Sequence, residues 1–167
     1  MTLIEHWMPA SYEGLGRILL ESVLCLGTAV LCGVVIGLER ERRHKPAGVR
    51  THVLVCVGAA GFVHLGAQAF TLGGGELGSV TDFNRLIHAV ATGIGFLGAG
   101  AIFRAGRGVT GVTTAASIWI MGAIGAAAGA GAVLFAALLT AFGYLVLRGL
   151  RFLDQEKKPL PPPPEPE

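Results

Sequence analysis

The densest charged segment of the chain, residues 37–52, reads GLERERRHKPAGVRTH. It places Glu39 and Glu41 among five Lys and Arg side chains, between two apolar runs. Cations alone are typical of a loop that orients a membrane protein, but carboxylates add little to that effect. Glu39 would also lie at a helix C-terminus, where the helix dipole disfavours an anion unless an arginine offsets it. We therefore interpret Glu39 and Arg50 as candidates for a functional or gating role, with a purely orienting loop as the alternative.

A second unusual segment, TGIGFLGAG at residues 92–100, contains Gly93, Gly95, Gly98 and Gly100. The first three glycines form GxGxxG, which indicates a dinucleotide site only after a strand, before a soluble helix and with a later acidic residue. That context is missing, so we reject a dinucleotide site. Each glycine costs a helix about 1 kcal/mol relative to alanine. The segment therefore predicts a kinked or broken helix that lines a cavity, or an intact helix that packs closely against a neighbour.

The third segment, GVTGVTTAASIW at residues 108–119, suggests the start of another helix. We expect Thr110 to be its N-cap, with Thr113 and Thr114 in the first turn. The run that starts at Thr51 begins on the same side, so two positive helix ends would face one region. That region also holds the cations Arg42, Lys45, Arg104 and Arg107. Such a region favours an anion, such as a lipid phosphate or an acidic partner.

Carboxylates that could bind a metal are few. Mg²⁺ prefers oxygen ligands, usually one or two carboxylates with retained waters, and Glu21, Glu39 and Asp82 are the candidate metal ligands. Arg17 lies four residues before Glu21 and is expected to pair with it. His64, in the middle of an apolar run, is either a functional group or a neutral histidine bonded to another helix. We find no nucleophile–base pair, zinc spacing or phosphate loop, so we expect a non-enzyme without a resident cofactor, with Mg²⁺ as the one metal considered as substrate or ligand.

The elements that position these residues are apolar helices. The chain of 167 residues is 52% hydrophobic and 14% charged, against about 25% charged for soluble proteins, and its mean hydropathy is +0.63. About 20 apolar residues are needed to cross a bilayer as a helix. We therefore predict an all-α integral membrane protein, a five-helix transmembrane bundle. The expected spans are 18–38, 51–70, 85–103, 112–128 and 131–147. A tight turn near Gly129–Gly131 separates the last two, and whether both cross fully stays open.

The distribution of Lys and Arg predicts the orientation of this bundle. If the loop after the first span is cytoplasmic, eleven of the 13 basic residues lie on the cytoplasmic side. An odd number of spans then places the N-terminal segment 1–17 outside and the proline-rich tail 148–167 in the cytoplasm. The 18–147 region between them is the transmembrane domain.

Three segments together resemble the MgtC/SapB family of bacterial inner-membrane proteins. They are residues 37–52, RLIHAVATGIGFLGAGAI at 85–102, and residues 108–119. The resemblance implies a plasma-membrane protein linked to magnesium homeostasis, either a Mg²⁺ transporter or a transport-associated factor. The candidate functional residues are Glu39, Arg40, Arg42, Lys45, Arg50, Thr51, Arg85, Gly93, Gly95, Gly98, Gly100, Thr113 and Thr114. Better-known members carry a soluble domain after the membrane part, where this chain has the proline-rich tail.

The partners expected from the sequence are the lipid bilayer and other membrane proteins. One alternative function is a non-transporting regulator that binds another membrane complex, as some family members are held to do with ATP synthase. A weaker alternative is anion or lipid-headgroup binding at the cytoplasmic face. Two GxxxG pairs, Gly33 with Gly37 and Gly125 with Gly129, predict close helix contacts, either within one subunit or between subunits. We expect a homo-oligomer, such as a dimer, and no nucleic-acid partner.

Overall fold

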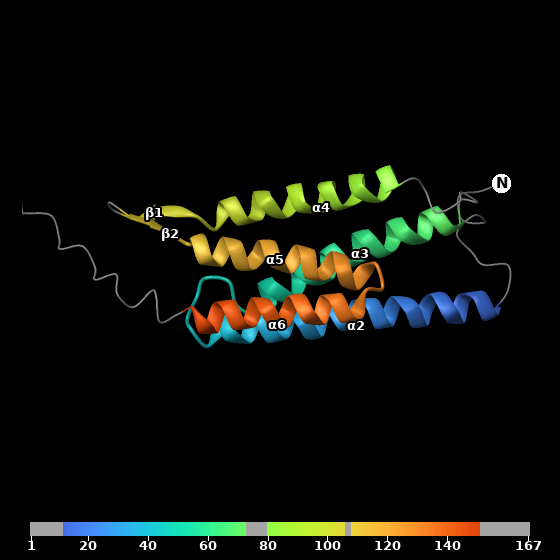
Figure 1. The fold of residues 1–167 in the computed structure, drawn as a ribbon, viewed down its shortest axis with the longest axis horizontal. Helices are drawn as coiled ribbons and strands as arrows, with labels where there is room; N and C mark the ends of the chain where they lie inside the picture. The colour runs from blue at the N-terminus through green and yellow to red at the C-terminus, as the bar shows by residue number, and fades with distance from the viewer. Residues whose placement is uncertain (1–11, 73–79, 106–107, 151–167) are drawn as a thin grey trace, which may run out of the picture.

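The computed structural model describes residues 12–72, 80–105 and 108–150, which form a bundle of five helices. The helices lie alongside one another, with their long axes along the long axis of the molecule (Figure 1). Their bounds are α2 Tyr12–Glu41, α3 Val49–Leu72, α4 Val80–Gly100, α5 Val112–Gly129 and α6 Val133–Gly149. The all-α bundle predicted from the sequence is therefore confirmed.

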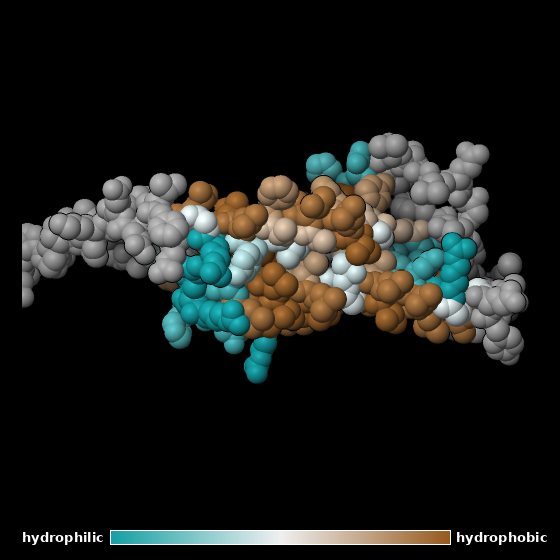
Figure 2. Space-filling model, turned by 60° about the horizontal axis from the view of Figure 1, so that its bottom comes forward, coloured by the Kyte–Doolittle hydropathy of each residue, from teal (hydrophilic) through white to brown (hydrophobic). Residues whose placement is uncertain are grey.

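The surface of the bundle is apolar around its middle. In Figure 2 a hydrophobic belt separates hydrophilic side chains at the two ends. By length and apolarity α2, α3 and α5 are each able to cross a bilayer, and α6 is apolar but has only 17 residues. Large apolar side chains point outward along the belt, among them Leu31, Phe62 and Leu134. A bilayer is the solvent that removes such a surface from water, so the chain is an integral membrane protein.

Helix α5 is the centre of the bundle. Of its apolar stretch 67% is buried inside the protein, against 22% for that of α2 and 28% for that of α3. The main core lies between α5 and its neighbours α2, α3 and α6. It is formed by Ala29, Cys32, Ile36, Cys56, Ala60, Met121, Ile124, Ala127, Ala128 and Ala136.

Both GxxxG pairs make contacts inside this chain. A Cβ atom added at Gly33 or Gly37 would lie 2.7 or 2.6 Å from a backbone Cα of α3. A Cβ at Gly125 or Gly129 would lie 2.2 Å from a backbone oxygen of α3. Without side chains at these positions the backbones of α2 and α5 can approach α3 closely, as is typical of membrane helices. Of the two alternatives, contact within one subunit is therefore the one found for both pairs.

The glycine-rich segment is helical throughout, so of the two alternatives the structure has the intact helix and not the broken one. Helix α4 continues without a break through Gly93, Gly95 and Gly98, and it ends at Gly100. Added Cβ atoms at Gly93, Gly95 and Gly100 would meet nothing within 4 Å, whereas one at Gly98 would approach a backbone oxygen of α5 at 3.5 Å. The helix stays intact because its backbone hydrogen bonds are made within the helix, which is the favoured solution in a membrane.

A short β-hairpin follows α4, and the sequence did not predict it. Strand β1 (Phe103–Ala105) pairs antiparallel with β2 (Gly108–Thr110), with Phe103 opposite Thr110. The span expected to run to residue 103 therefore ends at Gly100. The hydroxyl of Thr110 donates to the carbonyl oxygen of Phe103 at 3.3 Å, so its side chain is used in the hairpin.

Helix α5 begins at a glycine, and Thr110 is not its N-cap. The N-cap residue is Gly111, which has a left-handed φ of 86° and makes no side-chain cap bond. A Cβ at Gly111 would lie 1.9 Å from the carbonyl oxygen of Ala101, so only glycine fits. The prediction was wrong because the chain turns sharply from the hairpin into α5, and this turn requires the conformational freedom of glycine.

A glycine also closes the turn between α5 and α6. Gly131 has a left-handed φ of 78°. Its N–H donates to the carbonyl of Ala128 at 3.0 Å, and the N–H of Ala132 donates to that of Ala127 at 2.9 Å. These two bonds form a Schellman motif, which satisfies the last carbonyls of α5. The turn lies where the sequence predicts it.

Candidate functional site

The predicted site residues of the loop after α2 and of the start of α5 gather at one end of the bundle, here called the basic end. It comprises the loop 42–48 between α2 and α3, the hairpin, the start of α5 and the end of α6, which lie together in Figure 1. Arg85 belongs to the first turns of α4, which starts at the opposite end. The structure therefore does not bring Arg85 near the candidates at the basic end.

Glu39 and Arg40 form a buried ion pair at the end of α2. Glu39 is 6% exposed and Arg40 2% exposed, and Arg40 Nε donates to Glu39 Oε2 at 2.5 Å. Arg43, one turn later, forms a salt bridge with the other oxygen, Oε1. Burying the carboxylate would be costly without these partners. Arg50 instead lies exposed in the first turn of α3, so the structure does not join Arg50 and Glu39 in one site.

The second carboxylate of the loop caps α3. The backbone N–H of Val49 donates to Glu41 Oε2 at 2.9 Å. A Cβ at Gly48 would lie 2.8 Å from that oxygen, so glycine leaves room for the carboxylate. We expected the start of α3, with Arg50 and Thr51, to face an anion. The helix dipole favours negative charge at that helix end, and the carboxylate of Glu41 already occupies it.

The start of α5 faces a cavity of about 350 Å³. It is lined by His44, Lys45, Pro46, the hairpin and the first turn of α5, including Thr113 and Thr114. Lys45 and the two threonines thus line one cavity, in the region where the sequence suggests them. Arg42 lines a different cavity, between the ends of α2 and α6. The side chains of Arg104 and Arg107 lie outside the described residues.

A buried histidine links α3 and α5, and sequence reasoning missed it. His52 is fully buried, and its Nδ1–H donates to the carbonyl oxygen of Gly48 at 2.8 Å. Its Nε2 hydrogen-bonds Ser117 Oγ at 3.0 Å. In the neutral imidazole that proton is on Nδ1, so Nε2 is an acceptor. The one hydroxyl proton of Ser117 lies within hydrogen-bond distance of both Nε2 and the carbonyl oxygen of Thr114, which is 2.8 Å from Oγ. Polar residues inside two apolar runs were the available signal.

His64 belongs to a separate polar cluster nearer the other end. Its Nε2 lies 2.9 Å from Ser22 Oγ of α2 and 2.7 Å from Gln68 Nε2 of its own helix. These contacts fit the alternative in which His64 bonds to a neighbouring helix. His64 and Gln68 also line a cavity of about 370 Å³ together with Glu21 and Cys25.

The carboxylates considered as Mg²⁺ ligands do not lie together. Glu21 pairs with Arg17 at 2.9 Å, as predicted, and its side chain is 48% exposed. Glu21 and Glu39 are 18 residues apart in α2, which separates them by roughly 27 Å along the helix. The side chain of Asp82 lies outside the described residues. In the part of the chain that the structure describes, no three His, Cys, Asp or Glu side chains come together as a metal site.

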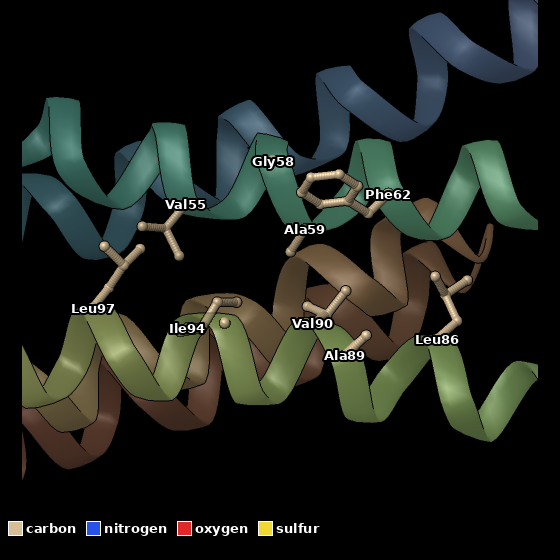
Figure 3. Close-up of a pocket in the computed structure, with 10 residues that line it drawn as sticks. Val55, Gly58, Ala59, Phe62, Leu86, Ala89, Val90, Ile94 and Leu97 are labelled. Carbon is tan, nitrogen blue, oxygen red and sulfur yellow. The ribbon is translucent and has the colours of Figure 1, made fainter.

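An apolar groove runs between α3 and α4 in the middle of the bundle (Figure 3). Its volume is about 320 Å³, and it is lined by Val55, Gly58, Ala59, Phe62, Leu86, Ala89, Val90, Gly93, Ile94 and Leu97. Phe62 is 66% exposed and Leu97 52% exposed at its edges. Added Cβ atoms at Gly58 and Gly93 would meet nothing within 4 Å. The helix backbones are therefore accessible from the groove.

Comparison with known proteins identifies the family of this bundle. Residues 26–156 match the model of the MgtC family. The chain belongs to the MgtC family. This confirms the resemblance found in its three motif segments.

The chain also resembles several individual relatives. It is 42% identical over 135 residues to the protein SrpB of Synechococcus elongatus, covering 76% of this chain and 73% of SrpB. It is 42% identical over 137 residues to the protein MgtC of Brucella abortus, covering 82% of this chain and 54% of that MgtC. It is 43% identical over 105 residues to the putative magnesium transporter YhiD of Escherichia coli, covering 62% and 47%. The chain thus matches about half the length of the MgtC and YhiD relatives. No solved structure matches it.

Proposed function

We propose that this chain serves magnesium homeostasis as a non-conducting factor that acts on another protein of the bacterial plasma membrane. Membership of the MgtC family and the relative named a putative magnesium transporter support the link to magnesium. The observation that carries the non-conducting role is the pairing of Glu39 with two arginines. A Mg²⁺ ligand has to offer a free oxygen. Oε2 of this buried carboxylate accepts a hydrogen bond from Arg40, and Oε1 lies in an ion pair with Arg43 without a hydrogen bond.

The orientation belongs to the same proposal. Arg40, Arg42, Arg43 and Lys45 lie at the basic end, and Arg148 lies in the last turn of α6 at that end. Short loops rich in Lys and Arg stay in the cytoplasm. The basic end is accordingly cytoplasmic, and the N-terminal segment is outside.

The groove between α3 and α4 is the surface for a transmembrane helix of the partner. Membrane helices associate through small residues that let backbones approach, and Gly58 and Gly93 leave the two backbones accessible at the groove. The groove lies in the apolar belt, so its occupant is an apolar helix rather than a soluble peptide. Because of the family resemblance, the membrane part of ATP synthase is the complex to test first.

A flux experiment tests whether the chain conducts Mg²⁺. The purified chain is reconstituted into liposomes that enclose a magnesium dye, and external Mg²⁺ is added at several pH values and membrane potentials. We expect traces equal to those of empty liposomes. Mg²⁺ entry that requires the protein and is reduced by Glu21→Gln would contradict the proposal; Glu21 is suited because it is exposed and its loss leaves the core intact.

A pumping experiment tests the partner. ATP-driven proton pumping is measured in inverted bacterial membrane vesicles with and without the protein, and we expect the protein to reduce it. Gly93→Leu fills the groove and should restore pumping. Gly95→Leu is the matched control, because Gly95 also has open space beside it but does not line the groove. Equal effects of the two substitutions, or no effect of the wild-type protein, would contradict this partner.

A second copy of the chain is the other occupant to distinguish. Leu97 lies at the groove edge and is 52% exposed, so Leu97→Cys would cross-link two chains if the groove formed a homodimer. A covalent dimer formed in native membranes would assign the groove to a homo-oligomer instead of a partner complex.

Direct Mg²⁺ transport is the second candidate function. The cavity lined by Glu21, His64 and Gln68 favours it, because a carboxylate and an amide offer oxygen ligands for a hydrated cation. It predicts Mg²⁺ entry in the flux experiment and loss of that entry in Glu21→Gln. The same measurement therefore separates the two candidates.

A further inference from the structure

A second large cavity lies at the basic end, between the end of α2 and the end of α6. Its volume is about 910 Å³. It is lined by Val35, Leu38, Glu39, Arg42, Arg43, Lys45, Tyr144 and Arg148. One part of this wall is cationic and the other is apolar.

The cationic part carries more positive charge than its neighbours neutralise. Within the part of the chain that the structure describes, four cations line the cavity, and Glu39 is the one carboxylate among the lining residues. The charge of Glu39 is already balanced by Arg43 and by the buried Arg40. Arg42 and Lys45 are exposed, so their charges are available to a ligand in the cavity. The ligand that this charge favours is an anion.

One arginine of the cavity is held in position. Arg148 Nη1 donates to the hydroxyl oxygen of Tyr144 at 2.9 Å, one turn earlier in α6. The guanidinium keeps its other N–H donors, and the tyrosine keeps its own O–H for a ligand. A guanidinium fork fixed in this way matches the geometry of phosphate oxygens.

The apolar part of the wall leads into the membrane belt. Val35 is 44% exposed and Leu38 39% exposed, and they lie three residues apart on one face of α2. They precede the charged end of the helix, so they lie on the side of the cavity that faces the middle of the bundle. Figure 2 shows the hydrophilic end directly adjoining the hydrophobic belt. A free inorganic anion would use only the cationic part of this wall.

We propose that this cavity binds the phosphate headgroup of an anionic membrane phospholipid. Arg42, Tyr144 and Arg148 hold the phosphate, and an acyl chain lies along Val35 and Leu38. Basic pockets between helices at the membrane boundary are the usual form of such sites. The bound lipid would join the ends of α2 and α6 on the cytoplasmic face.

Lipid titration of the purified full-length chain in detergent tests this proposal. Native mass spectrometry counts bound phosphatidylglycerol and, as the zwitterionic comparison, phosphatidylcholine. We expect phosphatidylglycerol to bind at about tenfold lower concentration than phosphatidylcholine. Roughly one to two charge-assisted hydrogen bonds account for a difference of this size. The double variant Arg42→Gln with Arg148→Gln should lose that preference. Tyr144→Phe, which removes the hydroxyl, should weaken binding of phosphatidylglycerol by about threefold.

Matched controls separate a built site from a charged surface. Arg50→Gln removes an exposed arginine at the same end that does not line the cavity, and it should change binding by less than about twofold. Arg148→Lys keeps the charge and the fold but loses the fork, so its binding should fall between wild type and Arg148→Gln.

Three results would overturn the proposal. Equal weakening by Arg50→Gln and by the double variant would show only general attraction to a basic surface. Unchanged binding in the double variant would place the lipid elsewhere. Displacement of phosphatidylglycerol by millimolar inorganic phosphate would show a site for a free anion, without a role for the apolar wall.

Discussion

Glu39 and Arg40 are neighbours in sequence, and both are almost completely buried at the end of α2. This pairing stabilises the end of α2. It also places the oxygens of Glu39 against Arg40 and Arg43 instead of a metal ion.

We predict that Glu39→Gln destabilises the fold strongly, because it leaves the buried charge of Arg40 without its main partner. Breaking a buried ion pair on one side typically costs about 3–5 kcal/mol. The measurement is the midpoint of thermal or SDS-induced unfolding of the purified protein. The double variant Glu39→Gln with Arg40→Gln should regain part of the loss, whereas exposed Arg50→Gln should change little. A loss in Arg50→Gln as large as that in Glu39→Gln would argue against the buried pair.

The buried contact between His52 and Ser117 joins α3 to α5. Ser117→Ala leaves Nε2 of the buried imidazole without a partner. An unsatisfied buried polar group costs about 1–3 kcal/mol, so we expect a loss of that size in the same unfolding measurement. Thr113→Ala, one turn earlier and exposed, is the control and should stay within about 0.5 kcal/mol of wild type. A similar stability for both variants would show that the histidine does not need the serine.

At the scale of the elements, α3 is the helix against which α2 and α5 pack most closely. Glycines of both GxxxG pairs allow this approach, and a side chain there has no space because it would meet backbone atoms. Backbone atoms cannot move aside as the end of a flexible side chain can. These glycines therefore determine the helix spacing inside one chain.

We predict that Gly125→Ala and Gly129→Ala each destabilise the protein, because their Cβ atoms would lie 2.2 Å from carbonyl oxygens of α3. Overpacking of this kind costs about 1–3 kcal/mol or more. Gly58→Ala should leave stability unchanged or raise it by up to about 1 kcal/mol, because nothing lies near its Cβ and alanine favours the helix. The opposite signs, measured by unfolding in one detergent, test the packing directly. A neutral Gly125→Ala would show that α3 and α5 lie farther apart.

At the scale of the whole molecule, the two ends differ in charge. The basic end carries the loop after α2 and the last turn of α6, and the apolar belt separates it from the end where Arg17 and Arg85 lie. Because the successive helices α2 to α6 run in alternating directions (Figure 1), the side of one loop determines the side of the others. The side of any one loop therefore determines the orientation of the whole bundle.

We predict that a reporter fused after residue 167 is cytoplasmic and that one inserted at residues 73–79 is outside. Retention of Lys and Arg on the inner side is the physical reason. Paired fusions of a fluorescent protein and of alkaline phosphatase measure both positions. Phosphatase activity of the C-terminal fusion would contradict the orientation.

The sequence by itself determined the helical bundle, the approximate limits of its helices and the family. The apolar runs of α2, α3 and α5 are long enough for their transfer into a bilayer to favour a helix whatever their neighbours are. The turn at Gly131 could also be predicted from the local sequence, because the chain needs a residue with left-handed φ there. Motifs of the family are continuous segments, so they too were visible without the fold.

Only the tertiary structure decided which side chains meet. Glu39 was singled out with Arg50, but α2 places it against Arg40 and Arg43. The hairpin, the cap from Glu41 and the contact between His52 and Ser117 were not predicted. Partners such as Tyr144 and Arg148 came to line one cavity with residues a hundred positions earlier. Apolar patterns specify that a helix forms, but its rotation and its neighbours depend on close packing against other helices, and that packing selects the partner of each polar group.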